Sequence, residues 1–183
     1  MRRFITVTTL AVLLIFGCIQ GALWQFDRHQ SRHDKNELIK SNIAKRSITE
    51  AELSTLEKSD LAWRTITLKG SFTPEKETLI RNRYHEGKYG FGVITLFQSD
   101  SGKLYWVDRG WVKAGKDAQT APEIIAAPEE QVSIVARVRL DKSLPVGAFF
   151  ALPNSGAGMI SKLNAQTGSA SEGFYLDLIS GSV

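Results

Sequence analysis

Residues 132–140 read VSIVARVRL, a stretch in which an apolar side chain occupies every even position. The odd positions include Ser133, Arg137 and Arg139. Because successive side chains of a β-strand point to opposite faces, this alternation predicts a strand with one buried face. The stretch therefore indicates a domain whose core is built from the faces of strands.

Five further stretches have strand character, and turn signals separate them. A Thr-Pro-Glu break at residues 73–75 divides the first two, and the turn at residues 99–102 closes a hairpin. Five or six short strands with few helices predict a mainly β (α+β) fold, a small antiparallel β-barrel or sandwich. The further predicted strands cover residues 63–72, 79–83, 91–98, 103–112 and 174–179.

Two short helices are predicted beside these strands. Thr49 and Glu52 have the spacing of a capping box, which predicts a helix over about residues 50–58. A second helix is expected near residues 160–166. Gly90 and Gly92 are expected to permit a close backbone approach or a bulge.

A long uncharged run precedes all of these elements. Residues 4–26 read FITVTTLAVLLIFGCIQGALWQF and would span about 34 Å as a helix, enough for a hydrocarbon core of about 30 Å. We favour a retained transmembrane helix. A cleaved signal peptide has a shorter apolar region, and a lipoprotein site at Cys18 would put the bulky Phe16 at a position that needs a small residue.

Residues 27–60 follow as a charged juxtamembrane helical region, and residues 61–183 form the β-rich domain. The positive-inside rule taken alone disfavours an outward domain, because several Lys and Arg residues follow the apolar run. Long domains are translocated regardless of flanking charge, so we expect the β domain on the extracytoplasmic side. With no transit segment ahead of the anchor, a bacterial inner membrane is the expected location.

Composition and motifs argue against several classes of function. The net charge of +4 is mild, and no basic stripe alternates with aromatics, so we expect attraction to lipid headgroups and no nucleic-acid binding. Cys18 is the only cysteine, which excludes an intramolecular disulfide. No G-x-S-x-G, P-loop or H-E-x-x-H motif occurs, and the sequence contains only three histidines. We therefore expect that the protein is not an enzyme.

Four residues have two interpretations each. His29 and His33 stand at i and i+4, which puts two imidazoles on one helix face within reach of a metal ion or haem iron. We favour a solvated helix face, because two ligands on an exposed helix bind weakly without a third. For Arg109 and Trp111 we favour a structural role in the domain, with a partner-binding surface as the alternative.

Four stretches, in order, resemble the Surfeit locus protein 1 family. Residues 21–28, GALWQFDR, resemble the family's Gly…Trp-Gln-x-x-Arg signature. Residues 63–72, WRTITLKGSF, are similar to its aromatic-Arg strand that ends in Gly-x-Phe. Arg83 with residues 90–95, GFGVIT, and then residues 105–112, YWVDRGWV, follow the family's order and spacing.

This resemblance implies a membrane-tethered assembly factor for cytochrome c oxidase that helps to place haem a in the catalytic subunit. The implied partners are that subunit, other oxidase assembly factors and membrane lipid. Trp24, Gln25 and Arg28 are then expected to form an interfacial recognition surface. The alternative is a tethered β domain that acts as a scaffold or binding module for another envelope complex.

Members of this family usually carry a second membrane helix after the β domain, and the residues associated with haem contact lie in it. The last hundred residues of this sequence contain no apolar run of about 18 residues. We therefore expect a truncated product or a single-span form, and we carry over no haem ligand. Haem a is a cofactor that only the resemblance implies.

Overall fold

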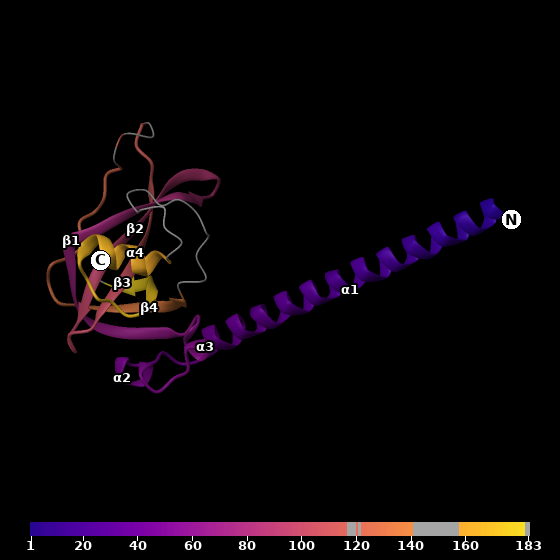
Figure 1. Cartoon of the computed structure of the whole chain (residues 1–183). Coiled ribbons are helices and arrows are strands. Elements are labelled where there is room, and N and C mark those ends of the chain that lie inside the picture. Colours follow the sequence, from indigo (N-terminus) through magenta and orange to yellow (C-terminus); the bar gives the residue numbers. More distant parts are fainter. Residues whose placement is uncertain (117–119, 121, 141–157, 182–183) are drawn as a thin grey trace. The chain divides into compact units, whose positions relative to one another are not determined.

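The computed structural model of the chain describes residues 1–116, 120, 122–140 and 158–181 (Figure 1). It contains two compact units, residues 1–41 and residues 42–183. The elements in order are α1 (Arg2–Ala44), α2 (Glu50–Leu53), α3 (Lys58–Leu61), β1 (Thr65–His85), β2 (Lys88–Ser99), β3 (Leu104–Lys113), β4 (Val132–Leu140), α4 (Met159–Thr167) and β5 (Phe174–Gly181).

Helix α1 is one uninterrupted helix, as the apolar run and the charged residues after it predict. It is long and apolar enough to cross a membrane, and the side chains of its apolar part are exposed. Its last turn belongs to the second unit, because the buried Asn42 donates a hydrogen bond from Nδ2 to the carbonyl oxygen of Ala62 at 2.9 Å. The limits of the membrane span and of the juxtamembrane region remain predictions.

The five strands close into a barrel in the order β1-β2-β3-β5-β4. Strands β1, β2 and β3 form an antiparallel meander, and β4 returns to pair with β1. This arrangement of four strands is a Greek key. Strand β5 then closes the barrel, antiparallel to β4 and parallel to β3.

The predicted barrel is therefore confirmed, but the expectation that all its strands are antiparallel is wrong. In a closed ring of five strands, the direction cannot alternate at every contact, because the number of strands is odd. The parallel contact between barrel strands joins residues 106–108 of β3 to residues 175–177 of β5. It is short, and it sets the geometry of the surface described below.

Strand β1 corrects the prediction of two separate strands around residues 73–75. It runs continuously, and its pairing with β2 skips between Thr73 and Glu77, so that Pro74 sits in an irregularity of the ladder. Proline has no N–H to donate and is tolerated at such bulges. At Gly70, β1 changes partner from β4 to β2, and a Cβ there would lie 2.0 Å from the carbonyl oxygen of Gln98.

Trp63, expected at the start of this strand, lies before it. Its φ of 66° is in the left-handed region, which is an outlier for a bulky residue. Its backbone N–H donates to the carbonyl oxygen of Val138 at 2.8 Å, which fixes the strained residue against β4.

The helix predicted over residues 50–58 is shorter than expected: α2 ends at Leu53, and α3 begins only at Lys58. The hydroxyl groups of Ser54 and Thr55 donate to backbone carbonyls three residues earlier, which offers the chain an alternative to a continued helix. The predicted capping box is present, with the Thr49 N–H donating to the Glu52 carboxylate at 2.8 Å. Arg46 also pairs with Glu52, and these bonds lower the pKa of Glu52 to about 2.

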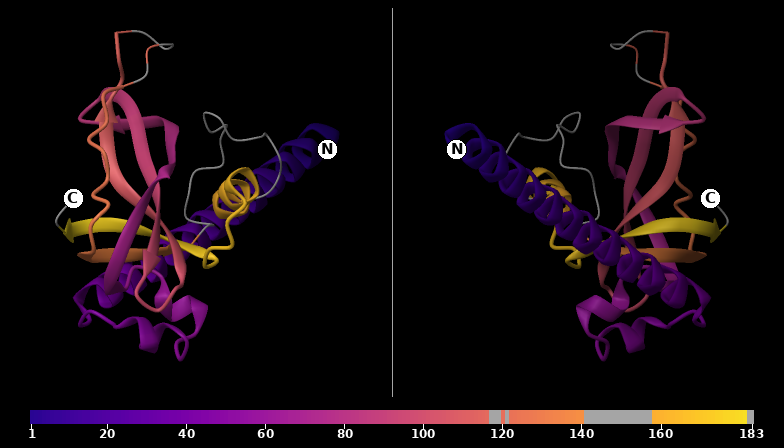
Figure 2. Two further views of the ribbon diagram at one scale, coloured as in Figure 1. Left: turned by 90° about the vertical axis from the view of Figure 1, so that its left-hand side faces the viewer. Right: turned by 90° about the vertical axis from the view of Figure 1, so that its right-hand side faces the viewer.

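Apolar side chains form two clusters, one inside the barrel and one outside it. The inner cluster takes one face of each strand, including the buried even positions of β4 from Val132 to Val138. In the outer cluster, α4 packs on β1, β2, β3 and β5 (Figure 2). Trp106 of β3 donates from its indole to Asn164 of α4 at 2.9 Å. Both faces of β2 and β3 are thus partly buried, which explains why β2 reads as a nearly continuous apolar run.

Candidate partner-binding surface

Trp111 of β3 packs across the start of β2. Its indole Nε1 donates to the carbonyl oxygen of Arg83 at 3.2 Å, and its ring lies 5.5 Å from the His85 ring, centroid to centroid. A Cβ at Gly90 would lie 2.4 Å from the indole, so this packing requires glycine. The close approach predicted at Gly90 is confirmed, and Trp111 fastens the β1–β2 hairpin to β3.

Two ion pairs lie beside Trp111 on the outside of the barrel. Arg83 of β1 donates to Asp108 of β3 at 2.8 Å, and Arg139 of β4 pairs with Asp177 of β5. The Asp108 side chain is only 12% exposed. Burial raises the pKa of Asp108 to about 6, the neighbouring Asp177 adds to this rise, and Arg83 opposes it. A cleft of about 270 Å³ lies between these four side chains and Trp111.

Trp63 packs against the Arg139–Asp177 ion pair. The Arg139 guanidinium lies 3.9 Å from the centre of the Trp63 ring, a cation–π contact. The strained backbone of Trp63 therefore presents its indole to the Arg139–Asp177 pair. Each of these four charges has an opposite partner, so the two ion pairs join β1 to β3 and β4 to β5.

Arg109 points to the other face of β3. Its guanidinium donates to Glu77 at 2.9 Å and to the carbonyl oxygen of Ile125 at 2.8 Å, and Thr95 also donates to Glu77. The Arg109 side chain is only 7% exposed. Arg109 thus joins three segments of the domain through a buried ion pair. Its predicted role toward a partner remains a prediction.

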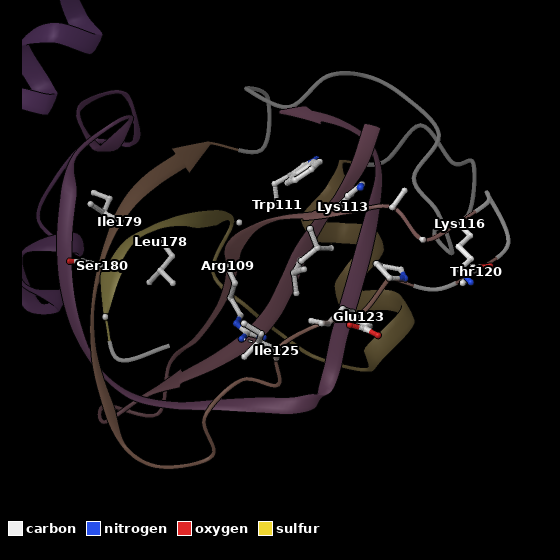
Figure 3. Close-up of a pocket in the computed structure, with 18 residues that line it drawn as sticks. Arg109, Trp111, Lys113, Lys116, Thr120, Glu123, Ile125, Leu178, Ile179 and Ser180 are labelled. Atoms are coloured by element: carbon white, nitrogen blue, oxygen red, sulfur yellow. Dashed lines mark hydrogen bonds between the residues drawn. The ribbon is translucent and has the colours of Figure 1, made fainter. Parts of the chain in front are cut away.

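A groove of about 940 Å³ opens next to Arg109 and Trp111 (Figure 3). Its walls are the end of β3, the segment that follows β3, and the end of β5. Ile125 and Ile179 on its rim are 82% and 48% exposed. The other labelled residues that line it include Lys113, Lys116, Thr120, Glu123, Leu178 and Ser180.

The other predicted site residues lie on α1, in the unit of residues 1–41. Trp24 is 60% exposed, and the Arg28 guanidinium lies 5.4 Å from its ring centre. Gln25 is also exposed. The rings of His29 and His33 are 6.5 Å apart and exposed. Among the residues that the structure describes, no group of three His, Cys, Asp or Glu side chains could hold a metal ion.

Sequence reasoning missed the partners of the arginines. Asp177 interrupts the apolar run of residues 174–179, which was a weak signal, whereas Glu77 stands in the polar run of residues 73–78 and gave none. Which arginine each acid meets depends on strand order and register, and local sequence does not contain these. Arg139 was recognised only as a residue on the polar face of its strand.

Comparison with known proteins gives a consistent result. The model of the SURF1 family matches residues 12–175. Uncharacterized SURF1-like proteins of Mycobacterium bovis and Mycobacterium tuberculosis are 29% identical over 166 residues, 86% of this chain and 60% of theirs. A SURF1-like protein of Rickettsia felis is 27% identical over 107 residues, 57% of this chain and 46% of its own.

The chain thus spans about 60% of the length of the mycobacterial relatives. The matched residues take in most of the apolar part of α1 and the strands up to the start of β5. They also include Trp111, the Arg83–Asp108 pair and Arg109. As the four stretches in the sequence predicted, the chain belongs to the SURF1 family.

Proposed function

We propose that this chain is a membrane-anchored assembly factor for cytochrome c oxidase, which assists the placement of haem a in the catalytic subunit through protein contact. The observation that carries the proposal is the family match over residues 12–175, since the family is known in general for oxidase assembly. Family membership also argues against a catalytic role, because this is not a family of enzymes.

The anchor and the domain support complementary parts of this role. Helix α1 supplies an apolar run of membrane-spanning length. Trp24 and Arg28 form a cation–π pair close to the end of that run, where an aromatic residue suits the headgroup region. We assign Trp24, Gln25 and Arg28 to contact with membrane lipid and with a partner helix. The β domain then contacts the catalytic subunit or another assembly factor from the extracytoplasmic side of a bacterial inner membrane.

Haem a enters this proposal as the cargo delivered to the partner. His29 and His33 are the imidazoles of this chain closest to the end of the apolar run, and both are exposed on one helix. We assign them to a solvated helix face and assign no residue of this chain as a haem ligand. The function proposed here therefore depends on protein contact.

The test is to identify the proteins that copurify with the full chain during oxidase biogenesis. A tagged chain is purified from mildly solubilised membranes at intervals after a pulse of labelled amino acids. The proposal expects newly made catalytic subunit to copurify early and to be lost from the tagged chain as the finished oxidase accumulates. Copurification with an unrelated envelope complex, without oxidase subunits at any time, would support the scaffold interpretation instead.

A further inference from the structure

The groove beside Arg109 lies where two strands of the barrel separate. The parallel contact of β3 and β5 ends at Asp108 and Asp177. Beyond it β3 continues only with β2, and β5 continues only with β4. The last residues of both strands therefore have one edge each without a neighbouring strand in the described part of the chain. The groove occupies this fork.

The edge of β3 offers unpaired backbone groups to the groove. In an antiparallel ladder, residues that exchange hydrogen bonds with the partner strand alternate with residues that do not. The N–H of Ala114 donates to Tyr89, one step past the pair Gly90–Lys113. The N–H and C=O groups of Lys113 and Trp111 therefore point away from β2. No backbone partner for them exists among the described residues.

Side chains around this edge give the groove a mixed character. The exposed Ile125 and Ile179 lie on opposite walls, and the half-buried Trp111 lies between the groove and the charged cleft. Exposed Lys113 and Lys116 stand on the β3 side. Glu123 is the only acid among the described lining residues, and the charge of Arg109 is balanced by Glu77. The groove thus has apolar walls and a positive rim.

We propose that this groove binds an extended segment of a partner protein, which adds to the free edge of β3 as a strand and carries an acidic residue between apolar ones. The partner's identity rests on the function proposed above, whereas the mode of binding does not. Strand addition takes its affinity from main-chain hydrogen bonds and its specificity from pockets for alternate side chains. Residues 109–113 offer an edge of about 16 Å, room for a segment of about five residues.

A strand suits this groove better than a lipid chain or a second copy of the domain. A hydrocarbon chain would cover the edge N–H and C=O groups without pairing them, which is unfavourable. A second copy would bring another positive rim against Lys113 and Lys116. A partner segment with a carboxylate satisfies both the backbone groups and the lysines.

Photocrosslinking in native membranes tests the occupant directly. A photoreactive phenylalanine analogue replaces Ile179 in the full chain, and in a control chain it replaces the exposed Lys69 of β1, outside the groove. After irradiation, mass spectrometry identifies the linked peptide. We expect position 179 to label one segment of another protein, with an acidic residue near the linked site. Labelling of lipid only, of a second copy only, or no labelling above the control position would overturn the proposal.

Matched substitutions at Lys113 separate the backbone bond from the charge. Lys113→Pro removes the edge N–H, and it should leave the β2 ladder intact because this N–H points away from β2. Lys113→Gln removes the charge and keeps the N–H. We expect Lys113→Pro to lower crosslinking about fivefold, the effect of one hydrogen bond, and Lys113→Gln about twofold. Equal effects of the two variants would refute strand addition.

A third variant distinguishes loss of binding from loss of folding. Ile125→Glu changes a side chain that is 82% exposed, so the fold is unaffected, and it places a negative charge against an acidic segment. We expect this variant to lose most of the crosslink from position 179. An unchanged yield would contradict the proposal. If the linked segment belongs to a protein unrelated to the oxidase, the groove assignment stands and the proposed function fails.

Discussion

Replacing Asp108 by asparagine should change how the stability of this protein depends on pH. Asp108 is buried on the outside of the barrel, where burial and Asp177 raise its pKa from 3.8 to about 6 despite the pair with Arg83. Arg139 also faces this group and favours its charged form. The folded protein thus binds a proton on Asp108 more tightly than the unfolded chain does.

The sign and size of the effect follow from this difference. Between pH 3.8 and pH 6 the folded state holds the proton and the unfolded state releases it, so stability falls as pH rises. A difference of about two pKa units corresponds to about 3 kcal/mol, most of it between pH 4 and pH 7.5. Asparagine does not titrate. Between pH 4 and pH 7.5, the free energy of unfolding should therefore fall by about 2–3 kcal/mol less in Asp108→Asn than in the unsubstituted protein.

The assay is urea unfolding of the full chain in mild detergent, followed by tryptophan fluorescence at several pH values. At a single pH, two effects on the free energy of unfolding oppose each other. Removing the buried charge raises it, and leaving the Arg83 donor without its carboxylate lowers it by about 1–3 kcal/mol. The slope with pH is therefore the diagnostic quantity. Equal slopes for the variant and the unsubstituted protein would refute the assignment of a raised pKa to Asp108.

Four further substitutions have expected outcomes. Gly90→Ala should lower the free energy of unfolding by about 3 kcal/mol, because its Cβ would lie 2.2 Å from a backbone oxygen. Gly92→Ala should have a far smaller effect, because its Cβ meets only a flexible arginine side chain at 3.2 Å; urea unfolding compares the two. Arg109→Met should cost about 3–5 kcal/mol in the same assay, because it leaves a carboxylate without its partner. Arg28→Ala should lower membrane haem a while the amount of this protein, read by immunoblot, stays constant.

Each of these has a result that would count against it. Equal losses for Gly90→Ala and Gly92→Ala would show that the indole packing is not as described. A neutral Arg109→Met would mean that its ion pair contributes no net stability. For Arg28, the matched control is Lys40→Ala, another exposed cation of α1. If both α1 variants leave haem a unchanged, the interfacial role of Arg28 is withdrawn.

The sequence was informative wherever a local pattern determines the structure. The alternation in residues 132–140 predicted β4 to the residue, because one face of that strand is buried and the other is not. The apolar run and the charged residues after it predicted α1. The capping box at Thr49 and Glu52 also formed as predicted.

The failures share one physical origin, which is competition that the local pattern does not reveal. Pro74 was expected to end a strand, but the ladder with β2 absorbs it in a bulge. The hydroxyl groups of Ser54 and Thr55 interrupt the helix that the capping box predicted over about residues 50–58. The parallel contact of β3 and β5 follows from closing an odd number of strands, which is a property of the whole sheet.

The candidate site shows the same division. Arg109 and Trp111 were identified from the sequence, yet their surroundings depend on strand order. Glu77 reaches Arg109 from a strand more than thirty residues away in the chain and was not predicted. The groove itself forms because β3 and β5 separate after a short contact, and no pattern of residues in the sequence predicts this separation.

The haem a content of membranes is the decisive measurement for the proposed role in oxidase assembly. Reduced-minus-oxidised absorption spectra are recorded from a strain that lacks this protein, and from the same strain carrying the 183-residue chain. If the protein is an assembly factor, the deletion strain loses the haem a signal and the chain restores it. An unchanged haem a signal and full oxidase activity in the deletion strain would contradict the assembly role.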